Sequence, residues 1–219
     1  MLNYSTSAEN YIKTIFHLQN GRNTVTTNAL AEKLHTKPAS VTDMMKKLKA
    51  KKLLHYQPYQ GFRLSTEGKK VALAIIRRHR LWEYFLSEKL KFKWDEVHIV
   101  AEDLEHVSSR QLIDKLDEFL GFPKFDPHGD PIPDSLGKME NSRQVCLTEL
   151  PVNKQGEVCR VVNQSAEMLE LLQHKKIGIG TKLEVKRKFL FDHSIEIKLR
   201  QQPAFSISEQ LAKNIFLSV

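Results

Sequence analysis

The sequence has little cysteine and no long apolar run. Its 219 residues include two cysteines, Cys146 and Cys159, which excludes a disulfide-rich scaffold, and their spacing is not that of a CxxC motif. We therefore interpret both as ordinary buried thiols. No apolar run approaches the roughly 20 residues that span a bilayer, and the N-terminal residues MLNYSTSAEN do not resemble a signal peptide. We expect a cytoplasmic protein with no membrane partner.

Motifs of the common metalloenzyme and nucleotide-binding classes are also missing. There is no HExxH motif, no pair of ExxH motifs and no glycine-rich nucleotide loop. These absences argue against an enzyme, although a metalloenzyme stays open as an alternative wherever His and Glu side chains surround a divalent ion.

The positive charge is confined to one end of the chain. Residues 1–73 contain twelve Lys or Arg and four Asp or Glu, whereas the remaining 146 residues contain 22 of each sign, so the whole net charge of +8 belongs to the first segment. A lysine-rich face is often only solvated surface, but an excess confined to one segment favours a polyanion partner.

Residues 1–73 have the pattern of a winged helix-turn-helix. A first apolar stripe ends at Asn20-Gly21, a second helix is expected over 26–35, and a third over 39–54 after Pro38, followed by a hairpin over 55–68. In this fold the second helix of the pair enters the major groove of DNA, and lysines neutralise phosphates. The expected DNA contacts are Thr26, Thr27, Lys37, Ala39, Ser40, Thr42, Asp43, Lys46, Lys47 and Lys49.

Residues 79–106 carry two clusters of candidate metal ligands. Glu83 lies one helical turn after His79, and three further ligands lie four, seven and eight residues after His98, so each group can share one side of a helix. Those three are Glu102, Glu105 and His106. Imidazole with carboxylate suits a divalent first-row metal. The alternative is a set of structural polar side chains.

The rest of the chain changes character after a linker at 134–143. Apolar residues then recur closer to every second position, in the segments VCLTEL, EVCRVV, KLEVKRKF and SIEIKL. This spacing predicts an all-β tail over about 145–219. His128, in the turn DPHGDPIP, is interpreted as a packing and turn residue. The expected fold is therefore mainly α with a β tail: a DNA-binding domain (1–73), an α-helical domain (74–140), and a linker with a β domain (141–219).

Five segments together resemble the diphtheria toxin repressor and manganese transport regulator family of metal-dependent transcription factors. They are TSAENYIKTIF, LSTEGK, RRHRLWE, VHIVAEDLEHV and DPHGDPIP, and the resemblance covers essentially the whole chain. It implies a homodimer whose interface and metals lie in residues 74–140, an SH3-like (FeoA-like) C-terminal domain containing IGIGTKLEV, and operator binding that metal strengthens. The implied function is a repressor of metal-uptake genes.

The resemblance also implies two ligand sets. The primary, regulatory site would consist of Asn10, Glu102, Glu105 and His106, and the ancillary site of His79, Glu83 and His98, with Gln164 and Glu167 from the C-terminal domain. Family members usually have Asp or Met where this chain has Asn10, and manganese-type members have Glu where it has Lys13. Because a charged lysine cannot ligate, separate metal sites are expected rather than a coupled pair.

The expected corepressor is Mn²⁺, with Fe²⁺ second. Relatives that sense iron tend to carry a thiolate and a thioether where this chain has Glu102 and Asn10, and hard oxygen donors suit Mn²⁺. Zinc or cobalt is expected to activate in vitro only. The remaining alternative is a metal-independent winged-helix regulator, which a metal titration of DNA binding would distinguish from both a metalloregulator and a metalloenzyme.

Overall fold

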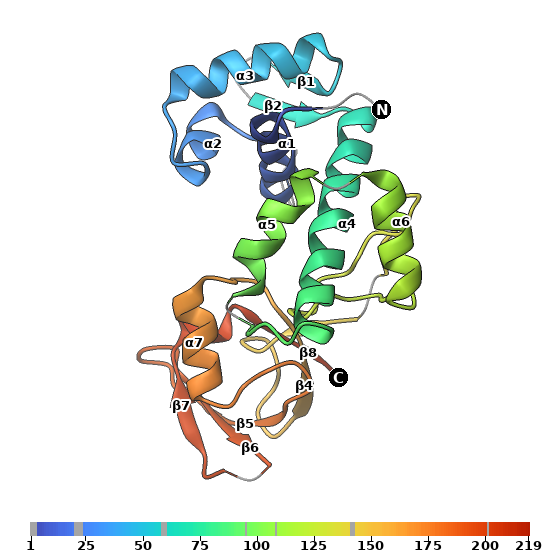
Figure 1. Ribbon diagram of the computed structural model, residues 1–219. Coiled ribbons are helices and arrows are strands. Elements are labelled where there is room, and N and C mark those ends of the chain that lie inside the picture. Colours follow the sequence, from blue (N-terminus) through green and yellow to red (C-terminus); the bar gives the residue numbers. More distant parts are fainter. Residues whose placement is uncertain are drawn as a thin grey trace.

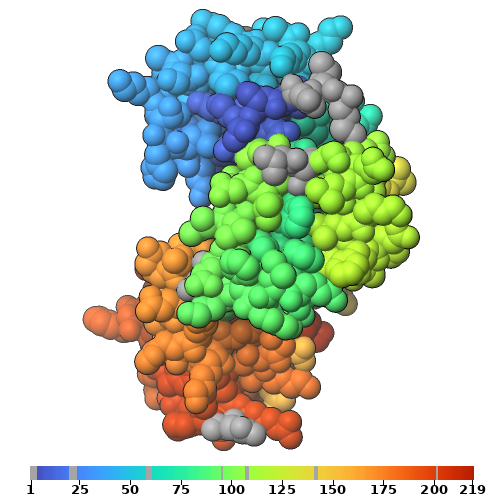
Figure 2. Space-filling model, viewed as in Figure 1, coloured from blue at the N-terminus to red at the C-terminus, as the bar shows by residue number. Residues whose placement is uncertain are grey.

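The computed structural model describes residues 4–19, 24–57, 61–94, 96–107, 109–140, 143–200 and 202–219. Three regions follow one another along an elongated molecule (Figure 1). The N-terminal region forms one end and the C-terminal region the other, with the helices of the middle region between them (Figure 2). The middle region is therefore in a position to connect events at the two ends.

The N-terminal region is a winged helix-turn-helix, as predicted. It contains α1 (Thr6–Leu18), α2 (Thr27–Lys33), α3 (Pro38–Ala50) and an antiparallel hairpin of β1 (Leu54–Gln57) and β2 (Gly61–Leu64). One apolar core joins these elements, including fully buried Ile12, Ile15, Leu30 and Val41. The expected Asn20-Gly21 helix end and the wing tip at 58–60 lie outside the described residues.

Helix α3 ends at Ala50, four residues before the expected end at Leu54. Lys52 has a positive φ of 60°, a left-handed conformation that stops a helix. Its N–H donates to Lys49 at 2.9 Å and that of Leu53 donates to Leu48 at 3.0 Å, which satisfies the last carbonyls. The helix therefore ends within the lysine-rich segment, and Leu54 begins the wing.

The middle region is built on one long helix, α4 (Thr66–Glu88), which Ser65 caps by accepting a hydrogen bond from Gly68. This helix passes through the expected boundary at 73–74, so the N-terminal and middle regions share it. Helices α5 (Val97–Val107) and α6 (Arg110–Phe119) flank it (Figure 1). Separate apolar clusters fix them: Leu86 meets α5, and Leu81 meets α6. The packing holds the ligand-bearing faces of α4 and α5 together.

The C-terminal region is β-rich but not all β, which corrects the expectation. Its antiparallel sheet has the order β3-β8-β4-β5-β6-β7. The strands are β3 (Val145–Cys146), β4 (Gln155–Val161), β5 (Lys182–Lys188), β6 (Ile195–Leu199), β7 (Phe205–Ile207) and β8 (Ile215–Ser218). Between them lie α7 (Ala166–His174) and the short α8 (Glu209–Ala212). Ser165 caps α7, whose buried Met168, Leu169 and Leu172 show helical spacing.

The two cysteines are free and half-buried rather than fully buried. Cys146 lies on β3 and Cys159 on β4, and the Cys159 thiol faces the Phe216 carbonyl at 3.4 Å. Burial raises the pKa of Cys159, which keeps it protonated.

The turn at 126–131 joins the C-terminal region to the middle region. Gly129 has a φ of 84°, and a Cβ there would collide with the Cys159 carbonyl, so only glycine fits. The N–H of Val161 donates to the His128 carbonyl at 2.9 Å. Asp130 accepts from Arg160 at 2.6 Å and from Gln164 at 2.9 Å. These contacts place the side chains of the turn beside α4.

Candidate metal centre and nucleic-acid interface

The first cluster forms where α4 meets the start of α5. His79 Nε2 lies 3.0 Å from Glu83 Oε1 and 3.0 Å from His98 Nδ1, and His98 Nδ1 lies 3.1 Å from Glu83 Oε1. The spacing of four residues stacks His79 above Glu83 on one face of α4. The structure thus brings the three residues expected at the ancillary site into contact.

The second nitrogen of His79 faces the other candidate ligands. Its Nδ1 lies 2.7 Å from Glu105 Oε2 and 3.8 Å from Glu102 Oε2. Burial lowers the pKa of His79, but Glu83 and Glu105 outweigh burial and raise that pKa to about 9. One imidazole therefore connects the two clusters, and protons compete with a metal ion for it.

Helix α1 contributes to the site through more residues than the sequence suggested. Glu9 accepts hydrogen bonds from His106 Nδ1 at 2.8 Å and from Arg78 Nη2 at 2.7 Å. With Nδ1 held in this way, His106 Nε2 is buried and has no hydrogen-bond partner among the described residues. A carboxylate behind an imidazole is the usual support of a metal-bound histidine. Glu9 lies next to Asn10 in the sequence, but no local pattern in either helix indicates that it supports His106.

Asn10 and Lys13 lie on the same helix. Asn10 Oδ1 is buried and, within the described part of the chain, makes no hydrogen bond. Lys13 Nζ lies 2.7 Å from Glu102 Oε2 and 2.7 Å from Glu105 Oε1. The expected primary ligands on α5 thus face α1, and Lys13 is an ion-pair partner rather than a ligand.

A third group surrounds Glu83 on the side of the C-terminal region. Ligand atoms of Glu83, Asp126 and His128 lie within 4.8 Å of one another, and all three residues are buried. Burial and the Glu83 charge hold the pKa of Asp126 well above its usual range. Asp126 Oδ2 and His128 Nδ1 have no hydrogen-bond partner among the described residues. No local pattern indicates this contact, because residues 126–128 are distant from Glu83 along the chain.

The packing predicted for His128 is present as well. Its ring stacks on Trp94 at a centroid distance of 5.5 Å, and its Nε2 faces the Trp94 carbonyl at 3.2 Å. Burial lowers the pKa of His128, which favours the neutral imidazole that metals bind.

The donor set fits a divalent first-row metal. It consists of imidazole nitrogens and carboxylate or amide oxygens, with no thiolate among them. Four buried donor atoms have no hydrogen-bond partner among the described residues, although His106 Nε2 lies 3.4 Å from Glu105 Oε1 and Asp126 Oδ2 lies 3.5 Å from Arg80 Nε. They provide a second argument, because such atoms cost free energy unless something binds them. They are Asn10 Oδ1, His106 Nε2, Asp126 Oδ2 and His128 Nδ1.

The expected DNA contacts lie on the outer surface of the N-terminal region. All ten are exposed except Thr27, which is half-buried, and a hollow between α2, α3 and the wing is lined by Thr26, Lys46, Lys49 and Tyr56 among others. Thr26 also caps α2, because its hydroxyl oxygen accepts from Ala29 at 3.2 Å. Asp43 lies 3.6 Å from Lys46. This surface is compatible with a DNA groove.

Comparison with known proteins identifies the family. Models of the iron dependent repressor match at residues 3–62 (N-terminal DNA binding domain) and 65–134 (metal binding and dimerisation domain), and a FeoA domain matches at 145–219. The iron-dependent repressor IdeR of Mycobacterium leprae is 31% identical over 171 residues, which are 75% of this chain and 74% of that relative. The chain belongs to the iron-dependent repressor family.

Two other similar proteins have manganese-related names. The HTH-type transcriptional regulator MntR of Oceanobacillus iheyensis is 34% identical over 120 residues, which are 55% of this chain and 81% of that relative. A solved manganese-dependent transcriptional repressor in complex with manganese has a TM-score of 0.87 and 31% identity, and the match covers 96% of this chain and 98% of that one. The family thus includes regulators named for either metal.

Family membership settles the alternatives left open by the sequence. As a member of the iron-dependent repressor family, the protein is a metal-dependent DNA-binding regulator and not an enzyme. The matched domains imply operator DNA and a second copy of the chain as partners, with a divalent metal as corepressor. Among the described residues of this repressor, no helix is both long and apolar enough to cross a membrane.

Two expected ligands of the repressor do not reach the clusters. The Gln164 amide donates to Asp130, and Glu167 is exposed in the first turn of α7.

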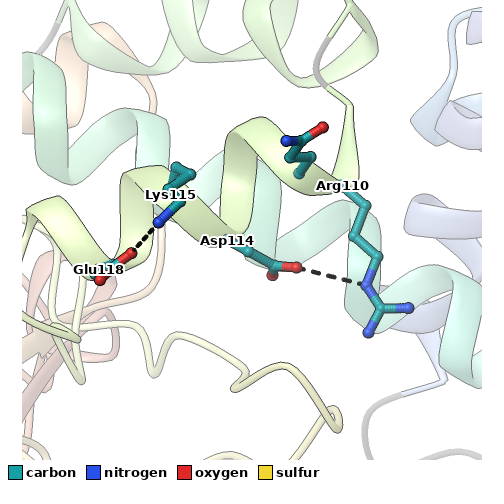
Figure 3. Close-up of a pocket in the computed structure, with 5 residues that line it drawn as sticks. Arg110, Asp114, Lys115 and Glu118 are labelled. Atoms are coloured by element: carbon teal, nitrogen blue, oxygen red, sulfur yellow. Dashed lines mark hydrogen bonds and ion pairs between the residues drawn. The ribbon is translucent and has the colours of Figure 1, made fainter.

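A shallow hollow on α6 is lined by none of the candidate metal ligands. Figure 3 shows that it is formed by two ion pairs of one helix face, Arg110–Asp114 at 3.6 Å and Lys115–Glu118 at 2.7 Å. Such exposed pairs are ordinary solvated surface.

Proposed function

We propose that this repressor uses Mn²⁺ as its corepressor, held by Asn10, Glu102, Glu105 and His106. The observation that carries the proposal is a pair of buried atoms with no hydrogen-bond partner among the described residues, Asn10 Oδ1 on α1 and His106 Nε2 on α5. His106 Nε2 also lies 3.4 Å from Glu105 Oε1, another of the four proposed ligands. The neighbours of Asn10 on α1, Glu9 and Lys13, both contact α5. When bound, the metal ion would accept a lone pair from Asn10 Oδ1 and another from His106 Nε2.

The donors favour manganese over iron. Asn10 and Glu102 offer hard oxygen, and Mn²⁺, which binds most N and O sites least tightly, depends on ligand type and geometry for its selection. Glu105 and His106 suit either metal, so Fe²⁺ is the second candidate. Zn²⁺ and Co²⁺ are expected to activate in vitro because they bind the same donors more tightly.

Metal binding would act on DNA through α1. This helix packs in the core of the DNA-binding region, where Ile12 and Ile15 are fully buried. Fixing α1 to α5 fixes the orientation of α3 relative to the dimerisation region. In a homodimer, the two α3 helices would then keep a separation of roughly 34 Å, one DNA turn, which two half-sites require.

A second ion would serve structure. We assign it to His79, Glu83 and His98, with Asp126 and His128 as further donors, because Glu83 belongs to both groups of ligand atoms. The turn at 126–131 contacts β4 of the FeoA domain. An ion at this position would therefore join that domain to α4. Gln164 and Glu167 are left outside the set, since one is bound to Asp130 and the other faces solvent.

The dimer surface is proposed at the C-terminal ends of α4 and α6. Leu90, Phe119 and Phe122 are 53%, 67% and 59% exposed, a concentration of large apolar side chains that marks an interface. Lys89 Nζ lies 5.7 Å from the Phe119 ring centre, so the two helix ends are adjacent.

The repressor would act in the cytoplasm, and the genes that it regulates would be those of metal uptake.

The test is to select a binding sequence from random duplex DNA with the Mn²⁺-loaded protein. Its affinity is then measured by fluorescence anisotropy across buffered Mn²⁺, Fe²⁺ (anaerobic), Co²⁺ and Zn²⁺. The proposal expects stimulation by Mn²⁺ at cellular concentrations. Stimulation by Fe²⁺ alone would contradict it.

A further inference from the structure

The group formed by His79, Glu102 and Glu105 already contains a positive charge that contacts both of its carboxylates. Lys13 Nζ is 2.7 Å from one oxygen of each glutamate. The Lys13 side chain is 13% exposed and that of Glu105 is 0% exposed, so water screens this contact poorly. Lys13 lies on α1, 89 residues before Glu102 and 92 residues before Glu105, which both lie on α5.

An ammonium and a metal ion exclude each other at this position. An ion bound to Glu102 Oε2 at about 2.2 Å would lie within about 5 Å of Nζ, because Nζ itself contacts that oxygen. Two like charges so close in a partly buried site repel strongly. His79 Nδ1, 2.7 Å from Glu105, therefore has no free ion to bind while Lys13 stays in place.

We propose that Lys13 is a tethered cation that takes the place of a metal ion between His79, Glu102 and Glu105. It limits the contact between α1 and α5 to one divalent ion, held by Asn10, Glu102, Glu105 and His106. It also keeps α1 attached to α5 before metal binds. This inference rests on the proposed function, because it assumes that the same glutamates bind that single ion.

The charge balance explains why a lysine fits here. Glu102 and Glu105 lie one turn apart on α5, and without a cation their charges would repel. In the metal-free protein Lys13 offsets one of these two negative charges and contacts both carboxylates, while Glu9 pairs with His106 and Arg78 on the other side of Asn10. The α1–α5 contact is then preformed, and a metal ion tightens it instead of creating it.

The test compares Mn²⁺ binding by the full-length wild type with Lys13→Glu, Lys13→Met and Lys13→Arg, using calorimetry and electron paramagnetic resonance. Lys154→Glu, an exposed residue of the C-terminal region, controls for the change in net charge. We expect Lys13→Glu to gain one Mn²⁺ per chain and to show the broadened spectrum of two ions that share a carboxylate. Wild type, Lys13→Arg and Lys154→Glu should show neither change.

Lys13→Met keeps the experiment decisive if Lys13→Glu does not fold, because removing the ammonium alone should loosen α1 in the metal-free protein. Hydrogen exchange of α1 amides should then increase in Lys13→Met and not in Lys13→Arg. A spin-coupled Mn²⁺ pair in wild type, or no gain of Mn²⁺ and no change in exchange in either variant, would overturn the inference. Failure of every variant and of wild type to bind Mn²⁺ would instead refute the proposed function.

Discussion

The two metal-ligand regions around His79 use similar donors but connect different parts of the molecule. The α1–α5 region joins the DNA-binding helices to the dimerisation region through Glu9 and Lys13. The region around Glu83 joins α4 to the turn at 126–131, which supports the FeoA domain. Ligand chemistry alone therefore does not make a site regulatory; what matters is which parts the ion would hold together.

Exposure does not separate the two regions. The side chains of Glu102 and His98 are 34% and 45% exposed, whereas those of Glu105 and Glu83 are 0% and 1% exposed. Each region therefore combines a donor that solvent reaches with a donor that is buried. The difference between the regions lies in the parts of the molecule that each ion would join.

The largest effect should come from His106→Ala. This change removes the α5 nitrogen of the regulatory site, so Mn²⁺ should no longer increase operator affinity, while the dimer stays intact. Anisotropy with the selected operator and sedimentation analysis measure the two properties. Gln173→Ala on α7, far from both regions in sequence, is a control that should respond like wild type. A full metal response in His106→Ala would place the regulatory site elsewhere.

His128→Ala should show the opposite pattern. Truncating this fully buried ring leaves a cavity beside Trp94 and removes its contact with Asp126, so the free energy of unfolding should fall by about 2–4 kcal/mol. Urea unfolding of the metal-free protein measures this loss. Metal-stimulated operator binding should persist at a temperature where the variant is folded. Equal loss of stimulation in His128→Ala and His106→Ala would remove the distinction between the regions.

Glu102→Cys tests the metal preference of the regulatory region alone. Replacing a hard oxygen with a thiolate should shift activation from Mn²⁺ towards Fe²⁺ under anaerobic buffered conditions. The ratio of the two activating concentrations is the measurement. An unchanged ratio would show that Glu102 serves Lys13 and not the metal.

The sequence predicted what local periodicity determines. The spacing of His79 and Glu83 on one helix, and of Glu102, Glu105 and His106 on another, follows from 3.6 residues per turn and could be read directly. The winged helix was predictable for the same reason.

Contacts between distant segments could not be read in this way. Glu9 and His106 are 97 residues apart, and no pattern in either helix indicates which carboxylate supports the imidazole. Asp126 appeared as a turn residue because its contact with Glu83 depends on the packing of a whole domain. Helix α7 was missed because short strands on both sides dominated the interpretation, although Ser165 followed by an apolar stripe was a helix signal.

The smallest expected effect separates the DNA surface from both metal regions. Lys47 is exposed on α3 and makes no ion pair with the described residues, so it is free to neutralise one phosphate. Lys47→Ala should weaken binding to all DNA sequences alike and reduce the slope of log K against log salt by about one unit. The metal response should keep its wild-type ratio, because the exposed Lys47 side chain makes no ion pair with a candidate metal ligand among the described residues. Ser40→Ala is the matched comparison: Ser40 lies at the start of α3, where base edges are expected, so its loss should change sequence preference and leave the salt slope unaltered. If Lys47→Ala leaves the slope unchanged, Lys47 lies outside the interface, and the lysine-rich end of α3 is solvated surface.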